Sequence, residues 1–217
     1  MSEQTSTVST SEDPRIVNLL VVQFMQGIVA VLGLNGLERA LQLAGLNRFR
    51  NQPPADSLDQ ELTLREYARL HQSIAQLAGR AGRRTLMRVG QAAFYYRWDH
   101  PHQWLPLASL VLKTTLPGRR PQKMLRAIAT GRETLLPDGR FRVQKIEQLL
   151  VYEDFLGTAC FGQESTDPVC HGEVGFLQAA MAQATGRETG VIQVVESACK
   201  ATGSESCRFE IQLRTEK

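Results

Sequence analysis

The stretch GVIQVVESACKATGSESCRFEIQL, residues 190–213, contains two strand-like runs joined by a short turn. Apolar β-branched residues fill the first run up to Glu196, and apolar and polar residues alternate in the second run, which begins at Cys207. Gly203 and the serines beside it favour a tight turn, because glycine tolerates a positive φ and serine favours turns. The sequence therefore predicts a C-terminal β-hairpin with Cys199 and Cys207 at the two ends of its turn.

A third cysteine, Cys170, opens a helix-like stretch and can approach this hairpin. Zn²⁺ takes four ligands in a tetrahedron, and a carboxylate can complete a set of three thiolates. Buried free thiols are the plainer alternative, because free cysteine often packs as a small apolar side chain and the paired Cys-x-x-Cys pattern is absent. A disulfide between Cys199 and Cys207 is a third alternative. Residues 1–13 show no signal-peptide pattern, so we expect a reduced thiol cluster in the cytoplasm. Cys160 fits no pattern and is expected to be a buried thiol.

Several separated elements between residues 167 and 214 resemble the 4-vinyl reductase domain family. They are a cysteine before a glycine-rich helix (CHGEVGFL, 170–177), a Thr-Gly-Arg turn at 185–187, and an ending of the form Glu-x-x-Cys, glycine turn, Cys-x-Phe at 196–209. The family includes proteins associated with bacteriochlorophyll and chlorophyll synthesis, hydrocarbon-binding regulators that sense aromatic effectors and, distantly, subunits of vesicle-tethering transport protein particles. The resemblance implies helices packed on a small antiparallel sheet.

The resemblance also implies a metal site. In phenol-sensing relatives the matching residues hold a structural zinc, which makes the implied ligands Cys170, Glu196, Cys199 and Cys207. Four protein ligands leave no position for water, so the role of such a zinc is structural rather than catalytic. Phenol-sensing members also present a His and a Trp to the effector, whereas this sequence has residues 119–121 (RRP) and 149–150 (LL) at the comparable distance. That difference disfavours a phenol sensor.

Composition limits the classes of partner. The chain has 217 residues, of which 42% are hydrophobic and 22% charged, as in an ordinary soluble globular protein. A net charge of +3 is too small to indicate general nucleic-acid binding, and the aromatic content of 6% shows no stacking pattern for single strands. We therefore expect no nucleic-acid partner.

Three segments are predicted along the chain: a disordered tail over residues 1–13, a helical arm over 14–60 and a ligand-binding domain over 61–217. In the arm, the apolar run from Ile16 to Leu34 approaches the length of a membrane span. Polar side chains within this run favour a buried core or dimer helix instead, so we expect a homodimer and at most peripheral membrane contact. A second short helix is predicted over Leu37–Leu46.

The larger segment begins with helices and ends with strands. Helical periodicity extends over Thr63–Ala78, Arg83–Tyr96, Trp104–Thr115 and Gln122–Thr130, and strand-like patterns begin at Phe141. A helix over His171–Thr185 precedes the hairpin. The predicted fold class is α+β, with helices packed against a small antiparallel sheet, a helical N-terminal arm and a zinc-clamped C-terminal hairpin.

A run of arginines followed by aromatic residues suggests a ligand site. The guanidinium group can bind a carboxylate through two hydrogen bonds, and flat rings can hold a ring system. A solvated basic face and ordinary core packing are the alternatives. The candidate residues are Arg80, Arg83, Arg84, Arg88, Phe94, Tyr95, Tyr96, Trp98, Arg119 and Arg120.

The sequence contains no catalytic motif and no nicotinamide, flavin or iron–sulfur signature. We therefore expect a non-enzymatic, zinc-stabilised protein that binds a hydrophobic small molecule. The resemblance makes a tetrapyrrole the expected ligand, with the protein acting as a carrier or assembly factor in chlorophyll synthesis or photosystem biogenesis. One alternative is a sensor module for a small aromatic or fatty effector that acts through a partner protein. A second alternative is a vinyl reductase.

Overall fold

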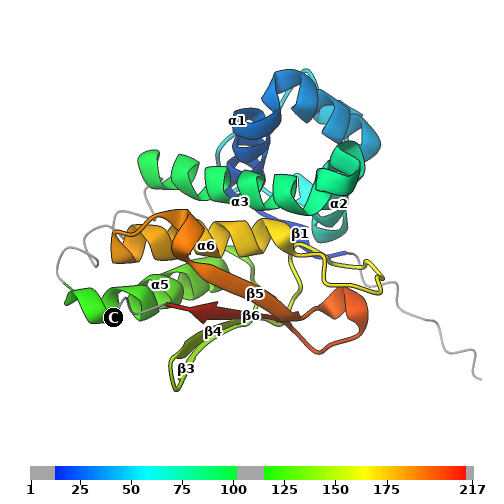
Figure 1. Cartoon of the computed structure of the whole chain (residues 1–217). Helices are drawn as coiled ribbons and strands as arrows, with labels where there is room; N and C mark the ends of the chain where they lie inside the picture. Colours follow the sequence, from blue (N-terminus) through cyan, green and yellow to red (C-terminus); the bar gives the residue numbers. More distant parts are fainter. Residues whose placement is uncertain (1–12, 102–114, 214–217) are drawn as a thin grey trace, which may run out of the picture.

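A four-stranded antiparallel sheet forms one layer of the computed structural model, which describes residues 13–101 and 115–213 (Figure 1). The strand order is β3-β4-β6-β5, so the C-terminal hairpin pairs with the β3–β4 hairpin through β6. Tyr152 of β4 lies opposite Phe209 of β6, and both side chains are fully buried. The bounds are β3 Phe141–Ile146, β4 Leu149–Asp154, β5 Gln193–Ala198 and β6 Cys207–Gln212.

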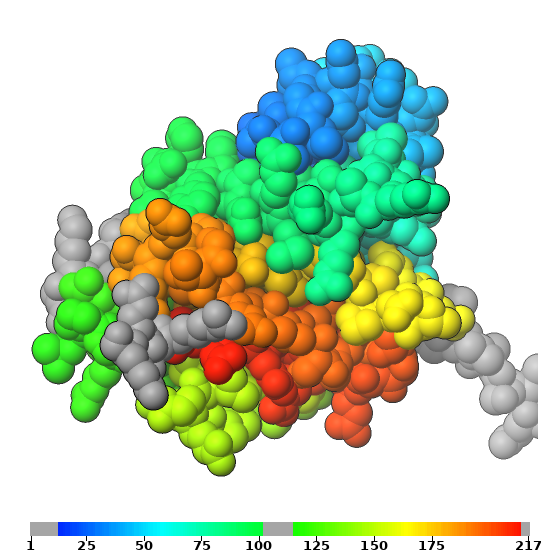
Figure 2. Space-filling view, viewed as in Figure 1, coloured from blue at the N-terminus to red at the C-terminus, as the bar shows by residue number. Residues whose placement is uncertain are grey.

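Helices cover one face of this sheet in successive layers (Figure 1). Helices α5 (Arg120–Leu135) and α6 (His171–Thr185) lie against the sheet, and α3 (Gly82–Asp99) packs on α6. Helices α1 (Asn18–Leu43) and α2 (Leu64–Ala78) pack on α3 and form the outermost layer. In the space-filling view, side chains fill the space between these layers (Figure 2).

Glycines bring the backbones of α3 and α6 into contact. A Cβ at Gly90 of α3 would collide with the carbonyl oxygen of Gly172, and a Cβ at Gly175 of α6 would collide with the carbonyl oxygen of Met87. Any larger residue at either glycine would force the two helices apart. This close crossing fixes the start of α6 relative to α3.

The N-terminal segment belongs to the same core as the rest of the chain. Strand β1 (Arg15–Ile16) pairs with β2 (Leu62–Thr63), and the buried side chains of α1 pack within the common hydrophobic cluster. Helix α1 is kinked at Gly33, which has φ +72°, so it consists of the two helical pieces that the sequence predicts. The division into an arm and a domain, and the homodimer, stay predictions.

Among the described residues, α1 is one helix that is long and apolar enough to cross a membrane, with a mean hydropathy of 1.7. However, 44% of its most apolar window is buried inside the fold. Its apolar face therefore serves as a core face here.

The α+β class, the helix over His171–Thr185 and the C-terminal hairpin are confirmed. The helix predicted over Trp104–Thr115 falls on residues of which all but Thr115 lie outside the described ranges. Short 3-10 helices complete the described elements: η1 Asn47–Phe49, η2 Gly79–Ala81, η3 Pro117–Arg119, η4 Thr189–Val191 and η5 Lys200–Thr202.

Candidate functional site

Four buried cysteines converge where α6 begins, where the β5–β6 turn lies and where the chain leaves β4. The sulfur atoms of Cys160, Cys170, Cys199 and Cys207 all lie within 4.8 Å of one another. Individual separations are 3.5 Å for Cys160–Cys207, 3.6 Å for Cys170–Cys207, 3.8 Å for Cys170–Cys199 and 3.9 Å for Cys160–Cys199. All four are free thiols, so no disulfide joins Cys199 to Cys207 in this structure.

These separations fit a tetrahedral metal site. Four sulfurs placed about 2.3 Å from a zinc ion lie about 3.8 Å from one another, which is the spacing observed here. The cluster is also buried, so it excludes water that would compete for the ion. Hydrogen bonds from Cys160, Cys170 and Cys207 lower the pKa of Cys199, while hydrogen bonds with its neighbours raise the pKa of Cys170. The cluster therefore favours a thiolate at Cys199, and metal binding would release the protons of the remaining thiols.

A tight loop places Cys160 in this cluster. The Asp154 carboxylate at the end of β4 accepts hydrogen bonds from the backbone N–H groups of Leu156, Gly157 and Thr158 at 2.8–2.9 Å. Gly157 has φ +70°, and its carbonyl then accepts a hydrogen bond from the N–H of Cys160. Sequence spacing gave no reason to include Cys160, because this loop brings it to the cluster through a turn with no metal-site pattern.

Glu196 lies beside the cluster on β5, next to an irregularity in the β5–β6 pairing. Its Oε2 accepts a hydrogen bond from the backbone N–H of Cys170 at 2.9 Å, and its Oε1 is buried without a partner among the described residues. Burial raises the pKa of Glu196 to about 9, and the negative charge at Cys199 acts in the same direction. Three of the ligands implied by the resemblance, Cys170, Cys199 and Cys207, thus lie together with Cys160, and Glu196 lies beside them.

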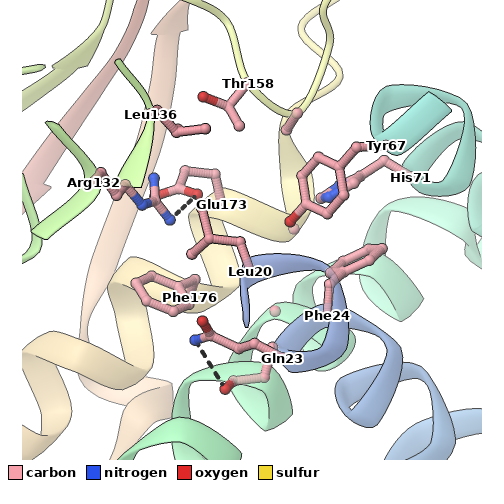
Figure 3. Close-up of a pocket in the computed structure, with 14 residues that line it drawn as sticks. Leu20, Gln23, Phe24, Tyr67, His71, Arg132, Leu136, Thr158, Glu173 and Phe176 are labelled. Carbon is pink, nitrogen blue, oxygen red and sulfur yellow. Dashed lines mark hydrogen bonds and ion pairs between the residues drawn. The ribbon is translucent and has the colours of Figure 1, made fainter. Parts of the chain in front are cut away.

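A small cavity lies on the other side of the α6 N-terminus, between α1, α2, α3, α5 and α6 (Figure 3). Its volume is about 40 Å³. Apolar side chains and several polar groups share its wall, and Tyr67 points its hydroxyl toward the centre (Figure 3). The side chains at its wall include Leu20, Phe24, Leu136, Phe176, Tyr67, His71, Thr158, Arg132 and Glu173.

His71 is the most unusual group in this wall. Its imidazole stacks on the ring of Phe24 with the centroids 3.7 Å apart, and neither ring nitrogen has a hydrogen-bond partner among the described residues. Burial and, to a smaller extent, the positive charge of Arg132 lower the pKa of His71 to about 3. The imidazole is therefore neutral near pH 7 and keeps a free acceptor and a free donor. The hydroxyl of Thr158 is likewise buried without a partner in the described part of the chain.

A buried ion pair closes the opposite side. Arg132 of α5 donates two hydrogen bonds of 2.8 Å to the carboxylate of Glu173 on α6, and a third of 3.1 Å to the hydroxyl of Tyr152. The Arg132 guanidinium also lies 5.0 Å from the ring centre of Phe176. Burial raises the pKa of Glu173, although its pairing with Arg132 opposes that shift. This bidentate pair ties α5 to the first turn of α6.

The ten predicted ligand-binding residues do not gather at this cavity, and none lines it. Arg80, Arg83, Arg84 and Arg88 are exposed on η2 and the first half of α3, where the first three line a separate surface hollow with Met87. Phe94 is buried and packs edge-on against Phe176, and Trp98 stacks on Phe94. The other four take part in local contacts: Tyr95 with Thr189, Tyr96 with His100, Arg119 in η3, and Arg120 with the carbonyl of Thr115.

Sequence reasoning missed His71, Tyr67, Arg132 and Glu173 as site residues. His71 and Tyr67 lie four residues apart, on the predicted apolar stripe of α2, where an aromatic residue normally signals core packing. Arg132 and Glu173 are 41 residues apart, and no local pattern pairs them. The available signal was a histidine on an apolar helical face.

Comparison with known proteins supports the family resemblance in the C-terminal part of the chain. The model of the 4-vinyl reductase domain matches residues 154–213, which include α6, β5, β6 and all four cysteines. No curated protein sequence matches the chain.

Solved structures similar to the chain are H-NOX proteins. One from S. oneidensis, in the Fe(II)NO ligation state, has a TM-score of 0.58 at 16% identity and covers 92% of this chain and 100% of its own. An oxygen-binding H-NOX domain related to soluble guanylate cyclases has a TM-score of 0.58 at 12% identity, covering 93% and 100%. A mutant H-NOX protein from K. algicida has a TM-score of 0.54 at 15% identity, covering 91% and 96%. At these identities the similarity shows the fold alone.

The prediction of a tetrapyrrole carrier or assembly factor in pigment synthesis is wrong. The fold over more than nine-tenths of the chain is similar to that of H-NOX domains, and the comparisons give no support to chlorophyll synthesis or photosynthesis. The 40 Å³ cavity also has no room for a pigment cargo, since pockets for drug-sized ligands measure about 300–1,000 Å³. Residues 154–213 thus match the 4-vinyl reductase domain family, within a chain whose fold is similar to that of H-NOX proteins.

Proposed function

We propose that this protein is a sensor module in which a compact effector binds the cavity between α1, α2, α3, α5 and α6. One observation carries this proposal: the buried His71 imidazole and Thr158 hydroxyl face a cavity without hydrogen-bond partners among the described residues. Leaving buried polar groups unpaired costs about 1–3 kcal/mol each. A ligand that supplies their partners would recover that energy, so these groups favour binding over permanent emptiness.

The wall defines the chemistry of the effector. Phe24, Phe176 and Leu20 offer apolar contacts, while His71 and Tyr67 offer hydrogen bonds at one side. This combination suits a small apolar or aromatic molecule that carries a single hydroxyl or similar polar group. An engineered cavity of about 150 Å³ in another protein holds one benzene ring, so an aromatic effector requires these walls to move outward.

That outward movement is the proposed signal. The cavity lies between α2, which carries Tyr67 and His71, and the first turn of α6, which carries Glu173. A ligand that separates them would shift the outer helices against the α6–sheet layer. A partner protein that contacts both the outer helices and the α6–sheet layer would bind differently after the shift. The output of the protein would then be a change in partner binding rather than catalysis.

The proposed metal is a structural zinc held by Cys170, Cys199, Cys207 and a fourth donor. It would attach the start of α6 to the C-terminal hairpin and so fix one wall of the cavity. The zinc would supply no chemistry to the effector, because four protein donors fill its coordination sphere.

A heme-dependent sensor is the second candidate, and the similarity to H-NOX structures is the observation that favours it. The described residues do not fit such a group as they stand. The cavity measures only about 40 Å³, His71 lies stacked on Phe24, and exposed His100 bonds with the carbonyl of Tyr96.

Titration of the purified full chain separates these candidates. Phenol and toluene would be compared by calorimetry and by thermal shift, and hemin by its Soret absorbance. We expect saturable binding of phenol that is tighter than that of toluene, because only phenol can bond with His71. His71→Phe should weaken phenol binding by at least about tenfold, the value of one hydrogen bond to a buried group.

The matched control is His100→Gln, which changes an exposed histidine outside the cavity and should leave phenol binding unchanged. A stoichiometric Soret band from hemin, without phenol binding, would replace the first candidate by the second. Saturable binding of none of the three probes would contradict the sensor proposal.

A further inference from the structure

The metal site contains one donor more than a tetrahedral ion requires. Four cysteine sulfurs lie within 4.8 Å of one another, and the carboxylate of Glu196 lies beside them, bonded to the N–H of Cys170, whereas zinc in structural sites takes four ligands. One of the five must therefore remain outside the coordination sphere at any time. The question of which donor is outside rests on the structural metal proposed above, and its test does not depend on the effector.

The geometry places Cys160 among the ligands. Its sulfur is 3.5 Å from that of Cys207 and 3.9 Å from that of Cys199, so it occupies a corner of the near-regular sulfur tetrahedron. The turn anchored by Asp154 holds it there, and the Gln163 side chain ties the same loop to the carbonyl of Ala68 at 2.7 Å. Cys160 is thus held in place without a metal.

The geometry also keeps Glu196 within reach of the same ion. One of its oxygens, Oε2, already accepts a hydrogen bond of 2.9 Å from the backbone N–H of Cys170. The other oxygen, Oε1, is buried with no partner among residues 13–101 and 115–213. A buried carboxylate oxygen without a partner is costly, and a metal ion is one partner that would satisfy it.

Exchange between the two donors conserves charge. A thiolate and a carboxylate each bring one negative charge, so a site with three sulfurs and one oxygen has the same net charge as a site with four sulfurs. The exchange also leaves Cys170, Cys199 and Cys207 in place, so the ion would still join α6 to the hairpin. The site can therefore change its fourth ligand without releasing the ion.

We infer that Cys160 is the fourth metal ligand in the resting protein and that Glu196 is a reserve ligand, which replaces Cys160 when that thiol is removed or modified. The exchangeable ligand is the one next to the effector cavity, because Thr158 and Ala159 line that cavity. Release of Cys160 would free this part of the wall while the metal stayed bound.

Cobalt(II) loaded into the full-length protein is the probe. Its visible bands report tetrahedral geometry, and its near-ultraviolet charge-transfer absorption grows with the number of thiolate ligands. We expect wild type and Glu196→Gln to give the same four-thiolate spectrum. Cys160→Ala should still bind one cobalt, with reduced charge-transfer absorption and about 10–100-fold weaker affinity, the usual range for a perturbed metal site.

The double variant Cys160→Ala/Glu196→Gln tests the replacement itself. It should lose far more affinity than the product of the two single losses, because neither donor remains. Glu205→Gln, an exposed glutamate in the turn between Cys199 and Cys207, is the matched control and should behave as wild type. Cys160→Ser serves the same comparison if the alanine variant does not fold.

Three results would overturn the inference. The first is a Glu196→Gln spectrum that differs from wild type while Cys160→Ala does not, which would make Glu196 the resting ligand. The second is complete loss of cobalt from Cys160→Ala. The third is a double variant that binds as well as Cys160→Ala, since something other than Glu196 would then fill the vacant position.

Discussion

The two ends of the first turn of α6 present opposite situations. Cys170, at the start of the helix, joins a cluster whose donors all point at one another. Glu173, one turn later, lies at a cavity where His71 and Thr158 have no partners among the described residues. In the first region, a single ion would provide a partner for every donor. In the second region, some of the hydrogen-bonding groups have no partner among the surrounding described residues. A saturated site suits stability, and an unsaturated one suits ligand binding.

Removal of the metal tests the role of the cluster in stability, and we expect it to have the largest effect on the free energy of unfolding. Zinc binding supplies about 10–16 kcal/mol in peptides that fold only with the ion. Chelation should therefore lower the Tm by at least about 10 °C, which for a chain of this size corresponds to a loss of about 3–5 kcal/mol. Hydrogen exchange should increase in β5, β6 and the start of α6 more than in α1 and α3.

The control for this experiment is zinc added back to the chelated protein, which should restore both the Tm and the protection from exchange. An unchanged Tm after complete zinc removal would show that the cluster does not stabilise the fold. Elemental analysis of the starting protein establishes how much metal it carried.

The same contrast explains which parts of the molecule could be predicted from sequence. The hairpin and the helix after Cys170 follow from local periodicity, and four of the five donors belong to a motif contained within a short stretch, residues 170–207. Cys160 was not predicted as a metal ligand, because it reaches the cluster through a turn anchored by Asp154, and such a turn has no metal-site sequence pattern. The cavity was not predicted at all, because its wall combines residues from helices that lie far apart in the sequence, among them α1, α2, α5 and α6.

The arginine–aromatic segment stays a prediction as a ligand site, and the structure places it away from the cavity. Arginines spaced four residues apart indicate a helical face, but the sequence does not say whether a ligand or water covers that face. Arg132, the arginine that does reach the cavity, has no such spacing. Its function depends on Glu173 and Tyr152, which only the folded chain places beside it.

Arg132→Met gives the next largest effect and tests the cavity side. The change leaves the Glu173 carboxylate buried without its cation, and loss of one partner from a buried ion pair costs about 3–5 kcal/mol. Chemical denaturation at pH 7 measures the loss. The double variant Arg132→Met/Glu173→Gln should recover part of it, because the unpaired charge is gone. A single variant as stable as wild type would show that the pair contributes no stability.

The pH dependence of stability should report His71. Burial lowers the pKa of His71 from 6.5 to about 3, so the folded protein binds this proton less readily than the unfolded chain does. The associated stability is fully present above pH 6.5 and is lost as the pH falls toward 3. Between pH 7 and pH 4 the loss is about 3 kcal/mol, at about 1.4 kcal/mol per pKa unit.

Denaturation of wild type and His71→Phe across this pH range isolates the contribution, because the phenylalanine ring can stack on Phe24 but cannot titrate. Tyr67, Arg132 and Glu173 also face the histidine and remain in both proteins. The difference between the two pH profiles should therefore be that of one histidine. Parallel profiles would mean that His71 is not held neutral.

The smallest expected effect is that of a substitution that changes the stability of the fold without touching the cysteine cluster or the cavity. Gly131 lies in α5, outside the cluster and the cavity wall, and a Cβ added there meets no atom within 4 Å. Gly131→Ala should stabilise the protein by about 0.5–1 kcal/mol, because alanine loses less backbone entropy in a helix. Gly175→Ala is the matched opposite, since its Cβ would collide with the carbonyl oxygen of Met87 and separate α3 from α6. If cobalt spectra and phenol binding respond to Gly175→Ala but not to Gly131→Ala, both regions depend on the position of α6 and not on overall stability.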